Sequence, residues 1–189
     1  NVCVIGLGSM GMGAAASCIR AGLNTWGVDL NPAALETLRQ TGARDAQTAA
    51  DGFVDQLEAV LLLVVNAKQV NAILFGDNGL AARLKPGTVV MVSSTISAQD
   101  AQQIEQRLAQ HQLLMLDAPV SGGAAKAATG EMTVMASGSD AAFERLQPVL
   151  EAVAAKVYRV GSEIGLGSTV KIIHQLLAGV HIAVGAEAM

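Results

Sequence analysis

VCVIGLGSMGMG, residues 2–13, is the stretch that decides the fold of this chain. Its first four residues are apolar, which is typical of a strand in a parallel sheet that helices cover on both faces. Glycines follow at once in the spacing G-x-G-x-x-G, and an alanine-rich helical segment comes next. A strand, a glycine turn and a helix in this order are typical of a unit that binds a dinucleotide. The opening stretch therefore predicts a dinucleotide site at the start of the chain.

Each glycine of this turn has its own predicted role. Gly6 permits the tight turn, Gly8 lets the backbone approach a pyrophosphate, and Gly11 lets the helix pack against the strand. The free N–H groups at the start of the helix favour a negative charge. We expect the cofactor to contact the whole loop, namely Gly6, Leu7, Gly8, Ser9, Met10 and Gly11.

A carboxylate follows at the distance that such a site requires. A second predicted strand, residues 25–28, leads into Asp29, which lies 18 residues beyond Gly11. An acid in this place accepts hydrogen bonds from the hydroxyls of the adenosine ribose and repels a 2′-phosphate. No arginine follows it directly, so the sequence favours NAD over NADP. A structural glycine turn with a solvated acid is the alternative interpretation.

Composition excludes several classes of protein. The 189 residues are 51% hydrophobic and carry a net charge of −4 with no basic cluster, so nucleic acid is not an expected partner. We find neither an uninterrupted apolar run of membrane-span length nor a secretory signal, so no membrane partner is expected. Cys3 and Cys18 are the only cysteines, which makes a disulfide framework improbable and favours the cytoplasm. No metal site is visible, since His174 and His181 lie seven residues apart with no carboxylate nearby.

Strands and helices alternate along the rest of the chain, with short polar turns between them. This alternation predicts an α/β fold with a doubly wound Rossmann-type sheet, formed by residues 1–162. The expected strands are residues 2–5, 25–28, 59–65, 88–92, 113–116, 133–136 and 157–160, and the expected helices are residues 9–21, 32–41, 48–56, 67–75, 98–110 and 140–150.

Three further residues are expected where two of these strands end. Val65 and Asn66 end the strand that begins at residue 59, and Thr95 follows the strand that begins at residue 88. Ligands of open parallel sheets bind in the crevice at this edge, so we expect these residues to contact the cofactor. For Asn66, a role as the N-cap of the next helix is an alternative that does not exclude the first.

Lys171 is the only charged residue between residues 164 and 180. Burial disfavours an ammonium group, and so does the positive end of a helix that begins near Ser168. Both effects lower the pKa, as a lysine general acid or base requires. Gln175 lies one turn further on the same face, and Gly167 one turn before it, where the missing side chain is expected to leave room for a ligand. A lysine whose charged end reaches solvent is the structural alternative.

Ser121-Gly122-Gly123 offers unobstructed N–H groups and one hydroxyl, which suit a carboxylate. An ordinary glycine turn is the alternative. The stretch from Gly165 onward is apolar on nearly every side, and such a helix must be buried all round. We therefore expect residues 163–189 to begin an interdomain helix and an all-α second domain, whose remainder follows Met189 and through which the protein forms a homo-oligomer.

The chain resembles the β-hydroxyacid dehydrogenase family in four separate motifs. Gly6–Gly11 is similar to the cofactor loop of that family, Asp117–Gly123 to its substrate-binding signature, and Gly165–Lys171 to its catalytic segment. Thr95 stands where the family has a residue that contacts both cofactor and substrate. The resemblance implies NAD as cofactor, a small hydroxy acid as substrate and a lysine as general acid/base, which would be Lys171. It also implies that the substrate is bound by Ser121, Gly122, Gly123 and Gln175.

One departure from the family affects the substrate. The family usually has asparagine four residues after the lysine, whereas this chain has Gln175. Residues 171–181 and 130–140 resemble the L-threonate dehydrogenase branch, which implies oxidation of L-threonate to 2-oxo-tetronate. Reduction of tartronate semialdehyde and oxidation of 3-hydroxyisobutyrate are the alternatives within the family, and a catalytically silent dinucleotide-binding module is the alternative outside it.

Overall fold

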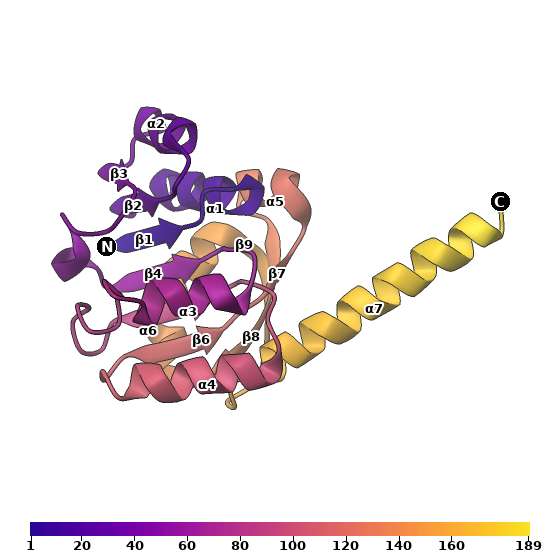
Figure 1. Cartoon of the computed structure of the whole chain (residues 1–189). Helices are drawn as coiled ribbons and strands as arrows, with labels where there is room; N and C mark the ends of the chain where they lie inside the picture. Colours follow the sequence, from indigo (N-terminus) through magenta and orange to yellow (C-terminus); the bar gives the residue numbers. More distant parts are fainter.

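The computed structural model describes all residues from Asn1 to Met189 and has one nine-stranded sheet. Figure 1 shows helices on both sides of this sheet and one long helix that projects away from it. The strands are β1 (Val2–Ile5), β2 (Thr25–Val28), β3 (Asp45–Gln47), β4 (Ala59–Leu62), β5 (Val89–Val92), β6 (Leu114–Asp117), β7 (Val120–Ser121), β8 (Met132–Gly138) and β9 (Ala154–Gly161). The helices are α1 (Ser9–Arg20), α2 (Pro32–Gln40), α3 (Ala67–Phe75), α4 (Ala98–Ala109), α5 (Gly123–Thr129), α6 (Asp140–Val153) and α7 (Leu166–Glu187), with a 3₁₀ turn η1 (Val54–Gln56).

The sheet confirms the predicted Rossmann-type fold. Its first six strands are parallel and lie in the order β3-β2-β1-β4-β5-β6, which is the order of dinucleotide-binding sheets. Beyond β6 the sheet is mixed, because β8 pairs antiparallel with β6 and then carries β7 and β9. The sequence did not predict this antiparallel extension.

Two hydrophobic cores lie on the two faces of the sheet, and β1 contributes to both. Val2 and Val4 belong to the first core, which packs against α1, α2 and α6, whereas Cys3 and Ile5 belong to the second, which packs against α3 and α4. This is why the opening strand has no polar residue. Burial raises the pKa of both Cys3 and Cys18, so the two thiols stay protonated and act as small apolar side chains.

Several predicted boundaries were wrong. Residues 48–56 do not form a helix; only η1 is helical there, and the strand before it, β3, escaped prediction because two of its three residues are polar. The strand predicted from residue 59 to 65 ends at Leu62, since its neighbours β1 and β5 end at Ile5 and Val92 and leave no strand to pair with. β7 and α5 were not predicted either, because a two-residue strand and a seven-residue helix between glycines carry no periodic signal.

Helix α7 is held by the sheet only at its beginning. Lys171 is 6% exposed, whereas the helix beyond it lies in solvent (Figure 1). The exposed apolar side chains on it are Ile172, Ile173, Leu176, Leu177, Val180, Ile182 and Val184. By length and composition alone α7 could cross a membrane, but a single helix of this kind is weak evidence for that.

Candidate active site

The glycine loop between β1 and α1 has the geometry that the sequence predicts. Gly6 has a φ of +90°, which favours glycine, and a Cβ on Gly11 would lie 1.7 Å from the carbonyl oxygen of Gly6. Above Gly8, in contrast, a Cβ would meet no atom within 4 Å. Gly8 is also the N-cap of α1 and no side chain caps that helix, so its first N–H groups remain available to an anion. The loop therefore fits a dinucleotide pyrophosphate.

Asp29 holds this loop from the neighbouring strand. Its Oδ2 accepts a hydrogen bond of 2.6 Å from the N–H of Leu7, and its Oδ1 accepts one of 2.8 Å from the N–H of Asn31. Beside it lies a cavity of about 460 Å³, lined by Gly6, Gly8, Asp29 and mostly apolar side chains from the ends of β1 and β2, the segment after β4 and α3. The sequence analysis predicted the carboxylate but missed the apolar wall, which includes Val64, Ala72 and Ile73. An apolar wall beside a carboxylate suits an adenosine.

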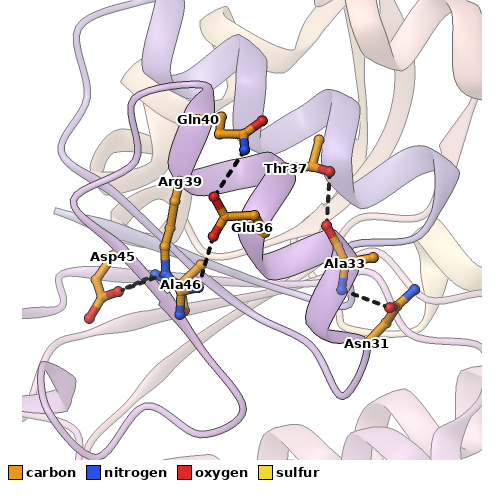
Figure 2. A network of polar contacts seen from close by, with 8 residues as sticks. All are labelled: Asn31, Ala33, Glu36, Thr37, Arg39, Gln40, Asp45 and Ala46. Carbon is orange, nitrogen blue, oxygen red and sulfur yellow. Dashed lines mark hydrogen bonds and ion pairs between the residues drawn. The ribbon is translucent and has the colours of Figure 1, made fainter.

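Arg39, the first arginine after Asp29 in the sequence, already has protein partners. Figure 2 shows Arg39 of α2 with Asp45 and Ala46, close to the pair formed by Gln40 and Glu36. Arg39 forms ion pairs with Glu36 and Asp45 and also donates to the carbonyl oxygen of Ala46. A 2′-phosphate would have to compete with these protein partners for the guanidinium.

A second cavity, of about 350 Å³, contains most of the residues predicted to do chemistry. It is lined by Met10, Leu63, Val64, Val65, Ser93, Ser94, Thr95, Val120, Ser121, Gly122, Gly123, Lys171 and Gln175. These residues come from the first turn of α1, the segments that follow β4 and β5, the segment around β7, and the first turns of α7. The predicted cofactor residues Met10, Val65 and Thr95 thus lie beside the predicted substrate residues. Residues separated by more than 160 positions meet here because they lie at the carboxyl edge of the sheet.

Asn66 lines neither cavity. Its side chain accepts a hydrogen bond of 3.0 Å from the N–H of Gln69 and so caps α3, which is the alternative interpretation of this residue. The neighbouring Val65 is 78% exposed and its N–H donates to the side chain of Gln69. Of this pair, only Val65 therefore faces the space where a ligand could bind.

Lys171 has no hydrogen-bond or ion-pair partner among the protein groups, although its side chain is buried in the cavity. Burial lowers its pKa below the ordinary value of a lysine, as expected. An amine with a lowered pKa and no protein partner is suited to exchange a proton with a ligand. Gln175 follows one turn later on α7 and also lines the cavity.

The structure gives Gly167 a different role from the predicted one. A Cβ there would lie 2.6 Å from the carbonyl oxygens of Asp117 and Met135, so the missing side chain permits close packing and leaves no space for a ligand. Gly122 and Gly123, in contrast, have φ values of +131° and +70°, which few other residues adopt. Their turn lines the cavity together with Ser121, as the prediction of a carboxylate cradle requires.

Two further polar residues of this region are Asp117 and Ser93. The first, Asp117, has a fully buried carboxylate, which binds the first turn of α7. The second is Ser93, whose Oγ is buried without any hydrogen-bond partner at the edge of the cavity.

Helix α1 is packed closely against α5, the helix that follows the glycine pair. A Cβ on Gly13 would lie 2.5 Å from the carbonyl carbon of Ala127, so the two backbones touch. Ser17 Oγ donates to the carbonyl oxygen of Ala127 over 3.1 Å, and Arg20 donates to that of Ala128 over 2.6 Å. The loop before α1 and the turn before α5 are thus joined through their helices.

The chain is similar in sequence and in fold to several known proteins. Residues 1–161 match the family described as the NAD-binding domain of 6-phosphogluconate dehydrogenase. The whole chain is 78% identical over 188 residues to an L-threonate dehydrogenase of Pectobacterium atrosepticum and 68% identical over 189 residues to one of Escherichia coli K12. It covers 62% and 63% of those two proteins, so it spans less than two thirds of their length. A solved structure from Salmonella typhimurium, described as a 3-hydroxyisobutyrate dehydrogenase, superposes with a TM-score of 0.94 at 63% identity, over 100% of this chain and 65% of that one.

Proposed function

Because the chain belongs to the family of the NAD-binding domain of 6-phosphogluconate dehydrogenase, we propose that it forms the cofactor site and supplies the catalytic lysine of an NAD-dependent hydroxy-acid dehydrogenase. The proposed reaction is the oxidation of L-threonate to 2-oxo-tetronate. The observation that carries this proposal is the placement of a buried, unpaired Lys171 in one cavity with Ser121, Gly122 and Gly123, next to the glycine loop.

The residues of the chain divide the reaction between them. The N–H groups at the start of α1 bind the pyrophosphate, and Asp29 binds the adenosine ribose through its carboxylate. When NAD is bound, it supplies the acceptor for the hydride that leaves the substrate carbon. Neutral Lys171 accepts the proton of the substrate hydroxyl at Nζ, so that proton and hydride leave the alcohol together and a ketone remains.

The substrate is held by the other residues of the same cavity. Ser121, Gly122 and Gly123 bind its carboxylate, Gln175 binds a hydroxyl, and Thr95 contacts substrate and cofactor. Four hydroxyl side chains and one amide line this space. So many polar groups suit an acid with several hydroxyls better than 3-hydroxyisobutyrate, which carries a methyl group. The names of the two L-threonate dehydrogenases support the same substrate.

The assay that tests this function compares substrates on the full-length protein with NAD. We expect L-threonate to give the highest kcat/KM, at least about tenfold above 3-hydroxyisobutyrate, because unpaired polar groups in the cavity penalise a methyl group. Reduction of tartronate semialdehyde with NADH is the third arm. If either competitor gives a higher kcat/KM, that compound replaces L-threonate as the proposed substrate. If none of the three is turned over, the protein is a catalytically silent dinucleotide-binding module.

Asp29 provides a prediction about the cofactor. The repulsion between this carboxylate and a 2′-phosphate about 4 Å away costs roughly 1 kcal/mol in bulk water and roughly 4 kcal/mol near a protein surface. We therefore expect NAD to bind at least about fivefold more tightly than NADP, measured by titration at one ionic strength. Equal affinities would show that a cation of the protein compensates the charge of the 2′-phosphate.

We further propose that α7 continues into a helical domain, with residues 163–189 as the start of an interdomain helix. The exposed apolar side chains of α7 support this, since a helix that is apolar on nearly all sides needs a cover. We propose a homo-oligomer formed through that domain, no nucleic-acid or membrane partner, and a cytoplasmic protein.

A further inference from the structure

The carboxylate of Asp117, at the end of β6, makes most of the side-chain hydrogen bonds that attach the start of α7 to the sheet. Its Oδ2 accepts hydrogen bonds from the N–H groups of Gly165 at 3.0 Å and Ser168 at 2.8 Å. Its Oδ1 accepts one from Ser168 Oγ at 2.7 Å. Gly165, the N-cap of α7, has no side chain that could cap the helix. Asp117 at the end of β6 accepts these hydrogen bonds instead.

Ser137 on β8 extends this attachment. Its Oγ accepts a hydrogen bond of 3.0 Å from the N–H of Gly167 and donates one of 3.4 Å to Asp117 Oδ2. Three N–H groups in the first turn of α7 therefore bond to side chains of β6 and β8. Gly167 brings the helix so close that a Cβ would collide with the carbonyl oxygen of Asp117.

Asp117 also leads directly into the other side of the cavity. Two residues after it the chain reaches Pro119, and Ser121, Gly122 and Gly123 follow. On α7, Lys171 lies three residues after Ser168, so one helical turn separates it from the bonded segment. Asp117 thus lies just before the turn that we propose binds the carboxylate of the substrate. It also holds the helix that carries the amine of Lys171.

We infer that Asp117 is a positioning residue, which sets where Lys171 Nζ lies relative to the Ser121–Gly123 turn; the inference rests on the proposed function. Asp117 is not among the residues that line the cavity. Its effect on the reaction passes through the helix, because α7 beyond Lys171 has no contact with the sheet that could hold the lysine in place.

The chemistry of the group explains why a carboxylate stands here. Burial raises the pKa of Asp117, while its hydrogen bonds from Ser168, Gly165 and Ser137 act in the opposite direction. An acceptor of several hydrogen bonds at a helix N-terminus is stabilised most when it is charged. Asparagine can keep much of this pattern, with its oxygen facing the two N–H groups and its amide group facing Ser168 Oγ. Alanine leaves the N–H groups buried without partners.

The test compares Asp117→Asn and Asp117→Ala in the full-length protein. We expect Asp117→Ala to lower kcat about 100-fold, the effect of displacing a catalytic group by about 1 Å, while the affinity for NAD stays unchanged. In Asp117→Ala, water that reaches the displaced Lys171 should raise the pKa of its amine. The pH profile of kcat/KM should therefore move to higher pH. Asp117→Asn should recover most of kcat and the wild-type profile.

Leu146→Ala is the matched control, because Leu146 is fully buried on α6, away from the cavity, and its truncation leaves a void in the core. We expect it to lower the melting temperature and to leave the pH profile in place. If Asp117→Ala behaves like this control, or if Asp117→Asn is as impaired as Asp117→Ala, the positioning role is overturned.

Two measurements without turnover separate this inference from the proposed function. Amide hydrogen exchange of residues 165–171 should accelerate at least tenfold in Asp117→Ala, and not in Leu146→Ala. The pKa of Lys171, followed by NMR after methylation with ¹³C, should rise in Asp117→Ala only. If the wild type oxidises no hydroxy acid, the proposed function fails while these two readouts still decide whether Asp117 places the lysine.

Discussion

Lys171→Met is expected to lower kcat for hydroxy-acid oxidation at least about 10³-fold and to leave NAD affinity within about twofold of the wild type. The loss follows because no other side chain in the cavity can take the hydroxyl proton, and a positioned general base contributes about 10²–10⁴-fold. Steady-state kinetics and a titration with NAD measure the two quantities. Lys156→Met is the matched control, since Lys156 is exposed on β9 and far from the cavity lining; it should retain full activity.

The same substitution should increase stability at neutral pH. Burial lowers the pKa of Lys171 in the folded protein, so the unfolded chain binds more protons between that pKa and the ordinary one. The lysine therefore destabilises the fold at pH 7, and this penalty disappears as the pH rises toward 10.5. Denaturation at several pH values should show Lys171→Met above the wild type at pH 7, with the gap narrowing as the pH rises. A less stable variant at pH 7 would mean that the lysine is structural.

Gly11→Ala should lower the stability of the fold, whereas Gly8→Ala should lower the affinity for NAD. At Gly11 the new Cβ would lie 1.7 Å from the carbonyl oxygen of Gly6, a backbone atom that cannot move aside without opening the turn. We expect a loss of more than about 4 kcal/mol in the free energy of unfolding, or no folded protein. Chemical denaturation of the purified variant measures the loss.

Gly8→Ala is the control and also a test of the cofactor path. A Cβ there meets no protein atom within 4 Å, so stability should remain within about 1 kcal/mol of the wild type. The methyl group would instead occupy the space of the pyrophosphate, and NAD affinity should fall at least about tenfold. A Gly8→Ala variant that binds NAD normally would place the dinucleotide elsewhere.

The parts of the fold that were predictable from sequence are those with a local signal. Apolar runs gave β1, β2 and β4, and the N-cap Asn66 placed the start of α3, where its side chain accepts a hydrogen bond from the N–H of Gln69. The direction of β8 could not be predicted, because antiparallel pairing with β6 depends on contacts that no local pattern records.

The candidate site was predictable in its residues but not in its supports. Motifs and spacing identified Gly11, Asp29 and Lys171, since each has a residue type that its proposed chemistry demands. They gave the wrong role to Gly167, because a glycine that makes space and one that permits contact are alike in sequence. The bond from Asp117 to Ser168 joins residues 51 positions apart, and only the folded chain shows it.

The close contact of α1 with α5 has a consequence for the thermodynamics of binding. With Gly13 against Ala127, the two helices form one body, and their N-terminal ends, one at the glycine loop and one at the glycine pair, contribute Met10 and Gly123 to the same cavity. The spacing between these two ends is therefore established during folding, and neither ligand has to spend binding energy on ordering the other's half. We therefore expect α1 and α5 to contribute little to cooperativity between binding of the cofactor and binding of the hydroxy acid. Any cooperativity that is measured should originate in α7, which is less restrained.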